Sequence, residues 1–213
     1  MKLRLAALVA LTLLSACRHA GDITEENGGG VYAVRSNCPI AGIPTGTGDI
    51  TLFNPSDSRD SRAIDVTATI TKLRSFCQES GDDVISTVSF TVTALRRDVG
   101  PERQVILPYF DVALRGGNQI EAKRIGAVAL NFAAGSQHAS TQAQASIRVN
   151  RGASTLPSNV RAMLTRPRKA GEADAAIDPM SDPVVARAVA NSTFEHLVGF
   201  QMSQDQLKYN ATR

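Results

Sequence analysis

Alternation of apolar and polar residues dominates the middle of the chain. Residues 64–70 alternate strictly, and residues 84–95 place Val88, Phe90 and Val92 on one face with serine and threonine on the other. A period of two is typical of a β-strand with one buried face, and β-branched residues favour pleated structure. We therefore predict two long strands here.

Further apolar runs extend the pattern to about seven strands. Residues 104–114 and 120–132 flank Arg115-Gly116-Gly117-Asn118-Gln119, whose glycines allow the positive φ angles of a tight hairpin. Pro108 removes a ladder donor and predicts a bulge or a sheet edge. The other candidates are residues 138–150, 31–34 and 50–53. Short strands at regular spacing predict a mainly β fold, an antiparallel β-sandwich of immunoglobulin-like architecture. The chain has no tryptophan, so one hallmark of immunoglobulin domains is missing.

Past residue 150 the pattern changes to one typical of helices. Ser158 is a candidate N-cap for a helix over residues 159–166, and Pro167 ends it. Asp182-Pro183 predicts the start of a second helix, with Asp182 as the N-cap and Pro183 at the first helical position.

The second predicted helix is amphipathic. Its apolar residues recur at helical spacing from Ala186 to Leu197. Ser203-Gln204-Asp205-Gln206 resembles a capping box and predicts a last short helix. We expect a sandwich over residues 31–152 with a helical segment, residues 153–213, packed on it.

The first residues resemble the leader of a bacterial lipoprotein. Lys2 and Arg4 precede an apolar run, residues 5–14, which is too short to span a bilayer and is typical of a signal peptide. Leu14-Ser15-Ala16-Cys17 then resembles a lipobox. The alternative is an ordinary signal peptide followed by a chance cysteine.

The resemblance implies where the protein is held. Residues 1–16 would be removed and diacylglycerol attached to Cys17, anchoring the protein to a membrane of the cell envelope by acyl chains such as palmitate. Arg18 stands where an enterobacterial sorting rule requires Asp for retention in the inner membrane, which favours the outer membrane. Residues 17–30 are polar and glycine-rich and predict a flexible tether.

Charge argues against one class of partner. The formal net charge is +3 and falls to +1 when Lys2 and Arg4 are removed with the leader. A nucleic-acid-binding protein would show a basic face or stripe, so we expect no nucleic-acid partner.

The cysteines predict a disulfide. If Cys17 carries lipid, Cys38 and Cys77 are the remaining pair in an oxidising compartment. Closing this loop would stabilise the fold by roughly 4 kcal/mol at most in the chain-entropy model. The alternatives, a zinc pair or a redox dithiol, lack further ligands and the usual C-x-x-C spacing.

Candidate chemistry is sparse. The three histidines, His19, His138 and His196, match no catalytic motif, and no familiar nucleophile, zinc or phosphate signature occurs. The aspartates within residues 57–60 and 82–83 could ligate calcium, but aspartate among serine, glycine or proline normally forms turns, which is the interpretation we favour. The basic residues that could meet anionic headgroups or glycans are Arg161, Arg166, Arg168 and Lys169. We expect no cofactor, no metal and no catalytic residue.

Three functions are compatible with these features. The first is a non-enzymatic interaction or assembly module that contacts another envelope protein. The second is a periplasmic carrier or chaperone for lipid or another hydrophobic ligand, which would need an open apolar cavity. The third is an enzyme without a recognisable motif, which would bring a histidine and an acid together in a cleft.

Overall fold

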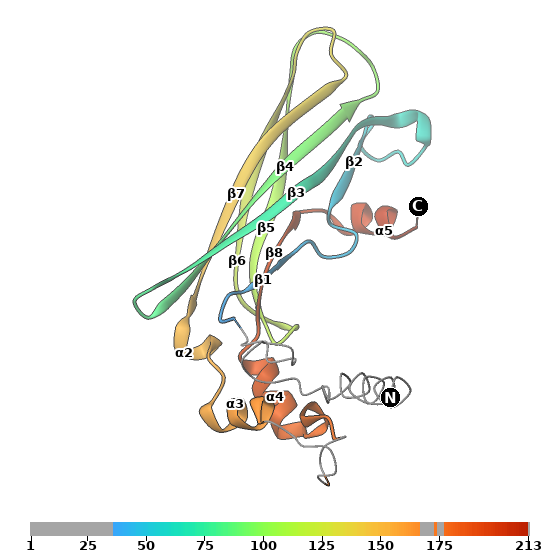
Figure 1. The fold of residues 1–213 in the computed structure, drawn as a ribbon. Helices are drawn as coiled ribbons and strands as arrows, with labels where there is room; N and C mark the ends of the chain where they lie inside the picture. The colour runs from blue at the N-terminus through green and yellow to red at the C-terminus, as the bar shows by residue number, and fades with distance from the viewer. Residues whose placement is uncertain (1–35, 167–172, 174–176, 213) are drawn as a thin grey trace, which may run out of the picture. The chain divides into compact units, whose positions relative to one another are not determined.

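A computed structural model describes residues 36–166, 173 and 177–212 of the protein (Figure 1). The predicted signal peptide, the lipobox with Cys17, the tether and the strand at 31–34 lie outside the described residues.

Two four-stranded sheets form the body. Sheet A has the order β1 (Ile40–Gly42), β8 (Phe194–Phe200), β5 (Arg103–Arg115), β6 (Gln119–Phe132). Sheet B has the order β2 (Asp49–Phe53), β3 (Ile64–Ser80), β4 (Asp83–Arg96), β7 (His138–Asn150). All neighbours are antiparallel except β1 and β8, which are parallel. The predicted β-sandwich is confirmed, while β1 and β8 were not expected as strands.

The core lies between the inner faces of the two sheets. Val88, Phe90 and Val92 of β4 are at most 2% exposed, as their alternation predicts. They belong to one cluster with side chains of sheet A such as Leu107 and Phe132. Full burial of a side chain of this size stabilises the fold by about 1.5–3 kcal/mol relative to exposure, so this cluster is the main source of stability.

The β5–β6 hairpin forms where the glycines predict it. Gly116 and Gly117 have φ angles of 62° and 80°. Pro108 lies one residue before Tyr109, where pairing of β5 with β8 begins, and its carbonyl accepts a hydrogen bond from Gln201 N–H (2.9 Å). The missing N–H of Pro108 therefore lies at the end of the pairing of β5 with β8, although β5 itself is an inner strand of sheet A.

Short helices follow β7. They are α2 (Arg151–Ser154), α3 (Ser158–Thr165), α4 (Pro183–Asn191) and α5 (Gln204–Thr212), with the 3₁₀ turn η4 (Pro179–Ser181) before α4. Another 3₁₀ turn, η3 (Ser61–Ala63), lies between β2 and β3. Leu156, Val160 and Val185 form a small buried cluster of their own around α3 and α4. At the opposite end of this segment α5 contacts β2, where Tyr209 packs edge-on against Phe53.

The helix predicted from Pro183 to Leu197 is wrong in its second half. The helix α4 ends at Asn191, and Phe194–Phe200 is strand β8, hydrogen-bonded between β1 and β5. Phe194, His196 and Val198 alternate and are all buried. Phe194 and Leu197 also fit the spacing of a helix. In the strand, however, pairing with both β1 and β5 buries every second residue, and this burial outweighs the helical pattern.

The caps were predicted with mixed success. Asp182 caps α4 by accepting from Val184 N–H (2.8 Å), and Ser203 and Gln206 exchange the two bonds of a capping box (3.2 and 2.9 Å). Ser158, however, is the first residue of α3 and makes no cap bond; Pro157 occupies the N-cap. Proline at the N-cap leaves the first N–H groups of α3 without a side-chain acceptor.

Candidate functional site

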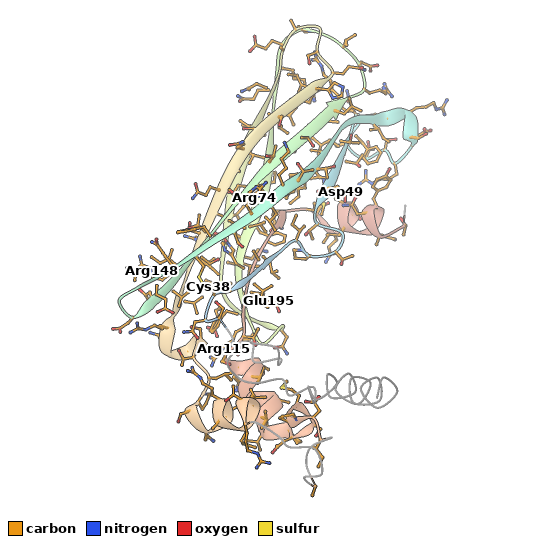
Figure 2. The ribbon with its side chains drawn as sticks, in the orientation of Figure 1. Cys38, Asp49, Arg74, Arg115, Arg148 and Glu195 are labelled. Carbon is orange, nitrogen blue, oxygen red and sulfur yellow. A yellow bond between two sulfur atoms is a disulfide. The ribbon has the colours of Figure 1, made fainter. Side chains whose placement is uncertain are left out.

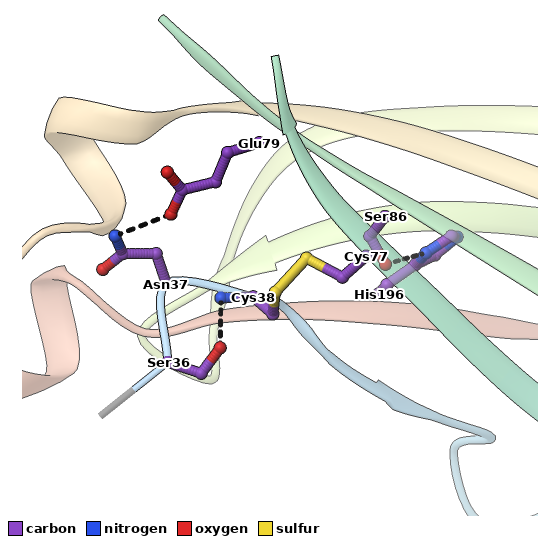
Figure 3. The surroundings of a disulfide bond; sticks show 7 residues. All are labelled: Ser36, Asn37, Cys38, Cys77, Glu79, Ser86 and His196. Atoms are coloured by element: carbon purple, nitrogen blue, oxygen red, sulfur yellow. Dashed lines mark hydrogen bonds between the residues drawn. A yellow bond between two sulfur atoms is a disulfide. The ribbon is translucent and has the colours of Figure 1, made fainter. Parts of the chain in front are cut away.

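The predicted disulfide is formed between Cys38 and Cys77 (Figure 3). It closes a loop with a sequence separation of 39 and ties the chain just before β1 to the inner face of β3. Cys77 lies directly opposite Ser86 of β4 in the strand register. The disulfide therefore lies beside the most polar part of the interior.

That polar part is a buried chain of hydrogen bonds. His196 of β8 contacts Ser86 through Nδ1 (3.0 Å) and Asp111 of β5 through Nε2 (2.9 Å). Ser86 and His196 are fully buried and Asp111 is 5% exposed. Arg124 of β6 donates to the second oxygen of Asp111 (2.9 Å). The network thus connects strand β4 of sheet B with strands β8, β5 and β6 of sheet A.

Serine, histidine and aspartate are also the residues of a hydrolase triad, but the arrangement differs. In that triad the serine bonds to Nε2 and the acid to Nδ1, whereas Ser86 faces Nδ1 and Asp111 faces Nε2. Both ring nitrogens of His196 thus have a hydrogen-bond partner inside the sandwich. Because the hydroxyl of Ser86 is shielded from solvent, the network suits sheet-to-sheet cohesion better than attack on a substrate.

Sequence reasoning missed this network. It placed His196 on a helix and gave no role to Ser86 or Asp111. The available signal was a polar residue at an inward position of an alternating strand, since Ser86 falls between Val84 and Val88. A buried polar residue of this kind needs a partner across the core.

A second buried polar group is structural. Arg96, 3% exposed, donates to four backbone carbonyls, those of Gly100, Pro101, Ala133 and Ser136 (2.6–3.1 Å). Its guanidinium also lies 5.4 Å from the centre of the Phe132 ring. The side chain fastens the β4–β5 and β6–β7 connections at one end of the sandwich.

The other candidate residues remain apart. His138 is exposed at the start of β7. Asp60 caps the turn η3, and the hydrogen bond from Arg62 lowers the pKa of its carboxyl. Asp82 and Asp83 lie at the β3–β4 turn. Among the described residues no group of three or more histidine, cysteine or acidic side chains is placed to hold a metal ion.

The predicted basic cluster is only partly described. Arg161 lies on α3 and Arg166 follows its last residue. Arg168 and Lys169 lie outside the described residues.

The outer face of sheet A is apolar near its edge. We call the side chains of Ile106, Pro108, Phe110, Ile125, Ala127 and Ala129 the β5–β6 face. They form three directly opposed pairs, and Ile106 and Ile125 are 62% and 56% exposed. Lys123 borders this face, with Nζ 5.5 Å from the centre of the Phe110 ring.

The outer face of sheet B has a different character. Across β3, β4 and β7 its rows are Thr69–Thr93–Ser140, Thr71–Thr91–Gln142, Arg74–Ser89–Gln144 and Phe76–Thr87–Ser146. Hydroxyl and amide groups dominate these rows. The sandwich therefore offers one apolar and one polar surface.

Comparisons with protein-family models, with curated proteins and with solved structures found no match. Within the described residues no helix has the length and apolar character needed to cross a bilayer.

Proposed function

We propose that the protein is a lipid-anchored, non-enzymatic interaction module of the cell envelope, and that it contacts a partner protein through the β5–β6 face. One observation carries the proposal: Ile106 and Ile125 are exposed on this face, and each lies directly opposite another apolar side chain, Ala129 and the half-buried Phe110. Contiguous exposed apolar surface is typical of protein–protein contacts.

The edge position of β6 supports the same surface. In the described part of the chain β6 pairs only with β5, and its first residues, 119–125, are exposed on both faces. Lys123 and Arg124 lie on this edge and discourage unspecific strand pairing. A partner would therefore be bound through side chains of the face.

The anchor is supported by two features. Leu14-Ser15-Ala16-Cys17 resembles a lipobox, and Arg18 after it favours the outer membrane. The Cys38–Cys77 disulfide suits an oxidising compartment outside the cytoplasm. Diacylglycerol on Cys17 would hold the sandwich close to its membrane partner.

A non-enzymatic role is supported by the position of the histidines. Of the two histidines that the structure describes, only His196 contacts an acid, and it has no exposed surface. His138 is exposed, and its backbone bonds to the hydroxyl of Ser136 two residues before it. No observation favours the carrier hypothesis, because the space between the sheets is filled by Phe90, Phe132 and Phe200.

Site-specific photo-crosslinking in intact cells tests the proposal. A crosslinkable residue replaces Ile106 or Ile125, and Thr93, exposed on the outer face of sheet B, serves as the matched control. We expect the same envelope protein to be captured from positions 106 and 125 and not from 93. Capture from 93 alone, or from none of the three, would contradict the proposal.

A further inference from the structure

The polar outer face of sheet B contains a depression of about 310 Å³. Its side chains come from three strands: Lys72 and Arg74 from β3, Ser89 and Thr91 from β4, Gln142 and Gln144 from β7. The volume falls at the lower end of the range of small-ligand pockets, about 300–1,000 Å³. It is large enough for a ligand of one or two rings.

A bulge in β3 creates the depression. Thr71 pairs with Thr91 and Arg74 with Ser89, so that Lys72 and Leu73 together oppose Phe90 alone. Leu73 packs against the core, and Lys72 is exposed with a φ of 53°. A left-handed φ is uncommon for a residue other than glycine and costs energy, which makes it a signal of function when a bulge maintains it.

The bulge brings the positive charges of Lys72 and Arg74 to the same depression. Neither Lys72 nor Arg74 forms an ion pair with any residue that the structure describes. The rows through Thr71, Arg74 and Phe76 carry no acidic side chain on β3, β4 or β7. Asp49, an acid of the same sheet, belongs to the neighbouring strand β2, where it pairs with Thr69 of β3. Figure 2 labels Asp49 and Arg74. The depression is thus complementary to an anion.

The surroundings favour a sugar over a bare ion. Two hydroxyls and two amides offer donors and acceptors that match the hydroxyl groups of a saccharide. Phe76, one row beyond Arg74 on the same face, is 64% exposed. An exposed aromatic ring beside polar groups provides a surface against which the C–H face of a sugar ring can pack.

We infer that this depression binds an anionic saccharide, a sugar unit bearing a carboxylate or a phosphate. Lys72 and Arg74 pair with the anion, the residues of β4 and β7 bond the hydroxyls, and Phe76 packs against the ring. The site is on the opposite sheet from the β5–β6 face, so it does not depend on the proposed protein partner.

Binding by the purified full-length chain tests the inference, measured by calorimetry at low and at physiological salt. The probes are trigalacturonate for the carboxylate, glucose 6-phosphate for the phosphate, maltotriose as a neutral saccharide and a short oligothymidylate as an anion of another class. We expect one of the two anionic saccharides to bind at least tenfold more tightly than maltotriose, with weaker binding at the higher salt.

Substitutions localise the site. Lys72→Gln with Arg74→Gln should weaken binding of the anionic saccharide at least tenfold, and Phe76→Ser severalfold. Arg148→Gln is the matched control, a cation of the same face that is already paired with Asp83 (3.3 Å) and should leave binding unchanged (Figure 2). Thermal melting establishes that each variant is folded.

Four results would overturn the inference. They are equal binding of maltotriose, tighter binding of the oligonucleotide, no binding of either anionic saccharide, and full binding by the folded Lys72→Gln/Arg74→Gln variant. Crosslinking from Ile106 and Ile125 is unaffected by any of them, so failure here and failure of the partner contact are separate results.

Discussion

Asp65 and Arg103 show how one ion pair ties the two sheets together. Arg103 of β5 donates two hydrogen bonds to Asp65 of β3 (2.8 and 2.6 Å), and this holds the pKa of the Asp65 carboxyl below its ordinary value of 3.8. Because the pKa of Asp65 is lower in the folded state than in the unfolded state, the ion pair stabilises the fold fully above about pH 4. This stabilisation is lost as the pH falls through the lowered pKa of the folded state.

We predict that Asp65→Asn lowers the free energy of unfolding at pH 7 by about 0.5–1 kcal/mol, a modest value because both side chains are partly exposed. The difference from the parent should shrink as the pH falls through the lowered folded-state pKa of Asp65, because the carboxyl then becomes protonated in both states. Urea unfolding at several pH values measures it. The control is Asp98→Asn, whose exposed pair with the neighbouring Arg97 should contribute little. A pH-independent difference would contradict the assignment.

Ser86 gives the second prediction at this scale. Ser86→Ala removes the hydroxyl that bonds Nδ1 of the buried His196, and should lower the free energy of unfolding by about 1–3 kcal/mol. Ser89→Ala, on the exposed face of the same strand, is the control and should change it by less than about 0.5 kcal/mol. Equal effects, read from denaturant unfolding, would show that the network contributes no cohesion.

Two of the three predicted caps, at Asp182 and Ser203 but not at Ser158, are correct. The bonds of Asp182 and of the Ser203–Gln206 box connect residues two or three positions apart, so spacing alone predicts them. His196 and Asp111 are separated by 85 positions, and only the fold brings them together. Hydrogen bonds between residues close in the sequence can be predicted from their spacing, whereas contacts across the core depend on how the strands are arranged.

At the scale of elements, strand β8 depends on a glycine. A Cβ added to Gly199 would meet Thr47 Oγ1 and would lie 2.7 Å from the ring of Phe110, so the three segments meet where only hydrogen fits. We predict that Gly199→Ala lowers the free energy of unfolding by about 1–3 kcal/mol through overpacking.

A double-mutant cycle tests this prediction. Thr47→Ala removes one of the two obstacles, so the cost of Gly199→Ala should be smaller in the Thr47→Ala background. Additive effects in thermal unfolding would mean that the crowding of Gly199 against Thr47 is not the cause.

The elements predicted correctly are those with one unambiguous period. The long strands β4 to β7 lie within one residue of their predicted bounds at each end. The prediction of residues 64–70 covers only the first part of β3 (Ile64–Ser80), because the bulge after Thr71 interrupts the alternation. Phe194–Phe200 satisfied both periods, and β1 has only three residues, Ile40–Gly42. Too few residues carry the signal in such segments, so pairing with distant strands decides their structure. The bulge at Lys72, which shapes the saccharide site, likewise follows from pairing between β3 and β4.

For the whole molecule the anchor is the decisive prediction. Cys17→Ser removes the sulfur to which diacylglycerol would be attached, and should move the protein from the membrane to the soluble fraction of cells. The measurement is fractionation with labelling by a palmitate analogue. Arg18→Ala, which leaves Cys17 in place, is the control and should stay membrane-bound. A Cys17→Ser protein that remains in the membrane fraction and resembles the parent in labelling would refute the anchor.

The Cys38–Cys77 bond also determines how the body responds to a mechanical pull. Tension transmitted along the chain from an N-terminal anchor enters the described body ahead of β1, whose pairing with β8 involves only Ile40, Ala41 and Gly42. Such a short pair would peel open one bond after another. The disulfide instead passes the load from Cys38 to β3, a strand of 17 residues paired over most of its length with β4. Under such a load the disulfide would bear the tension before the three-residue pairing of β1 with β8 does.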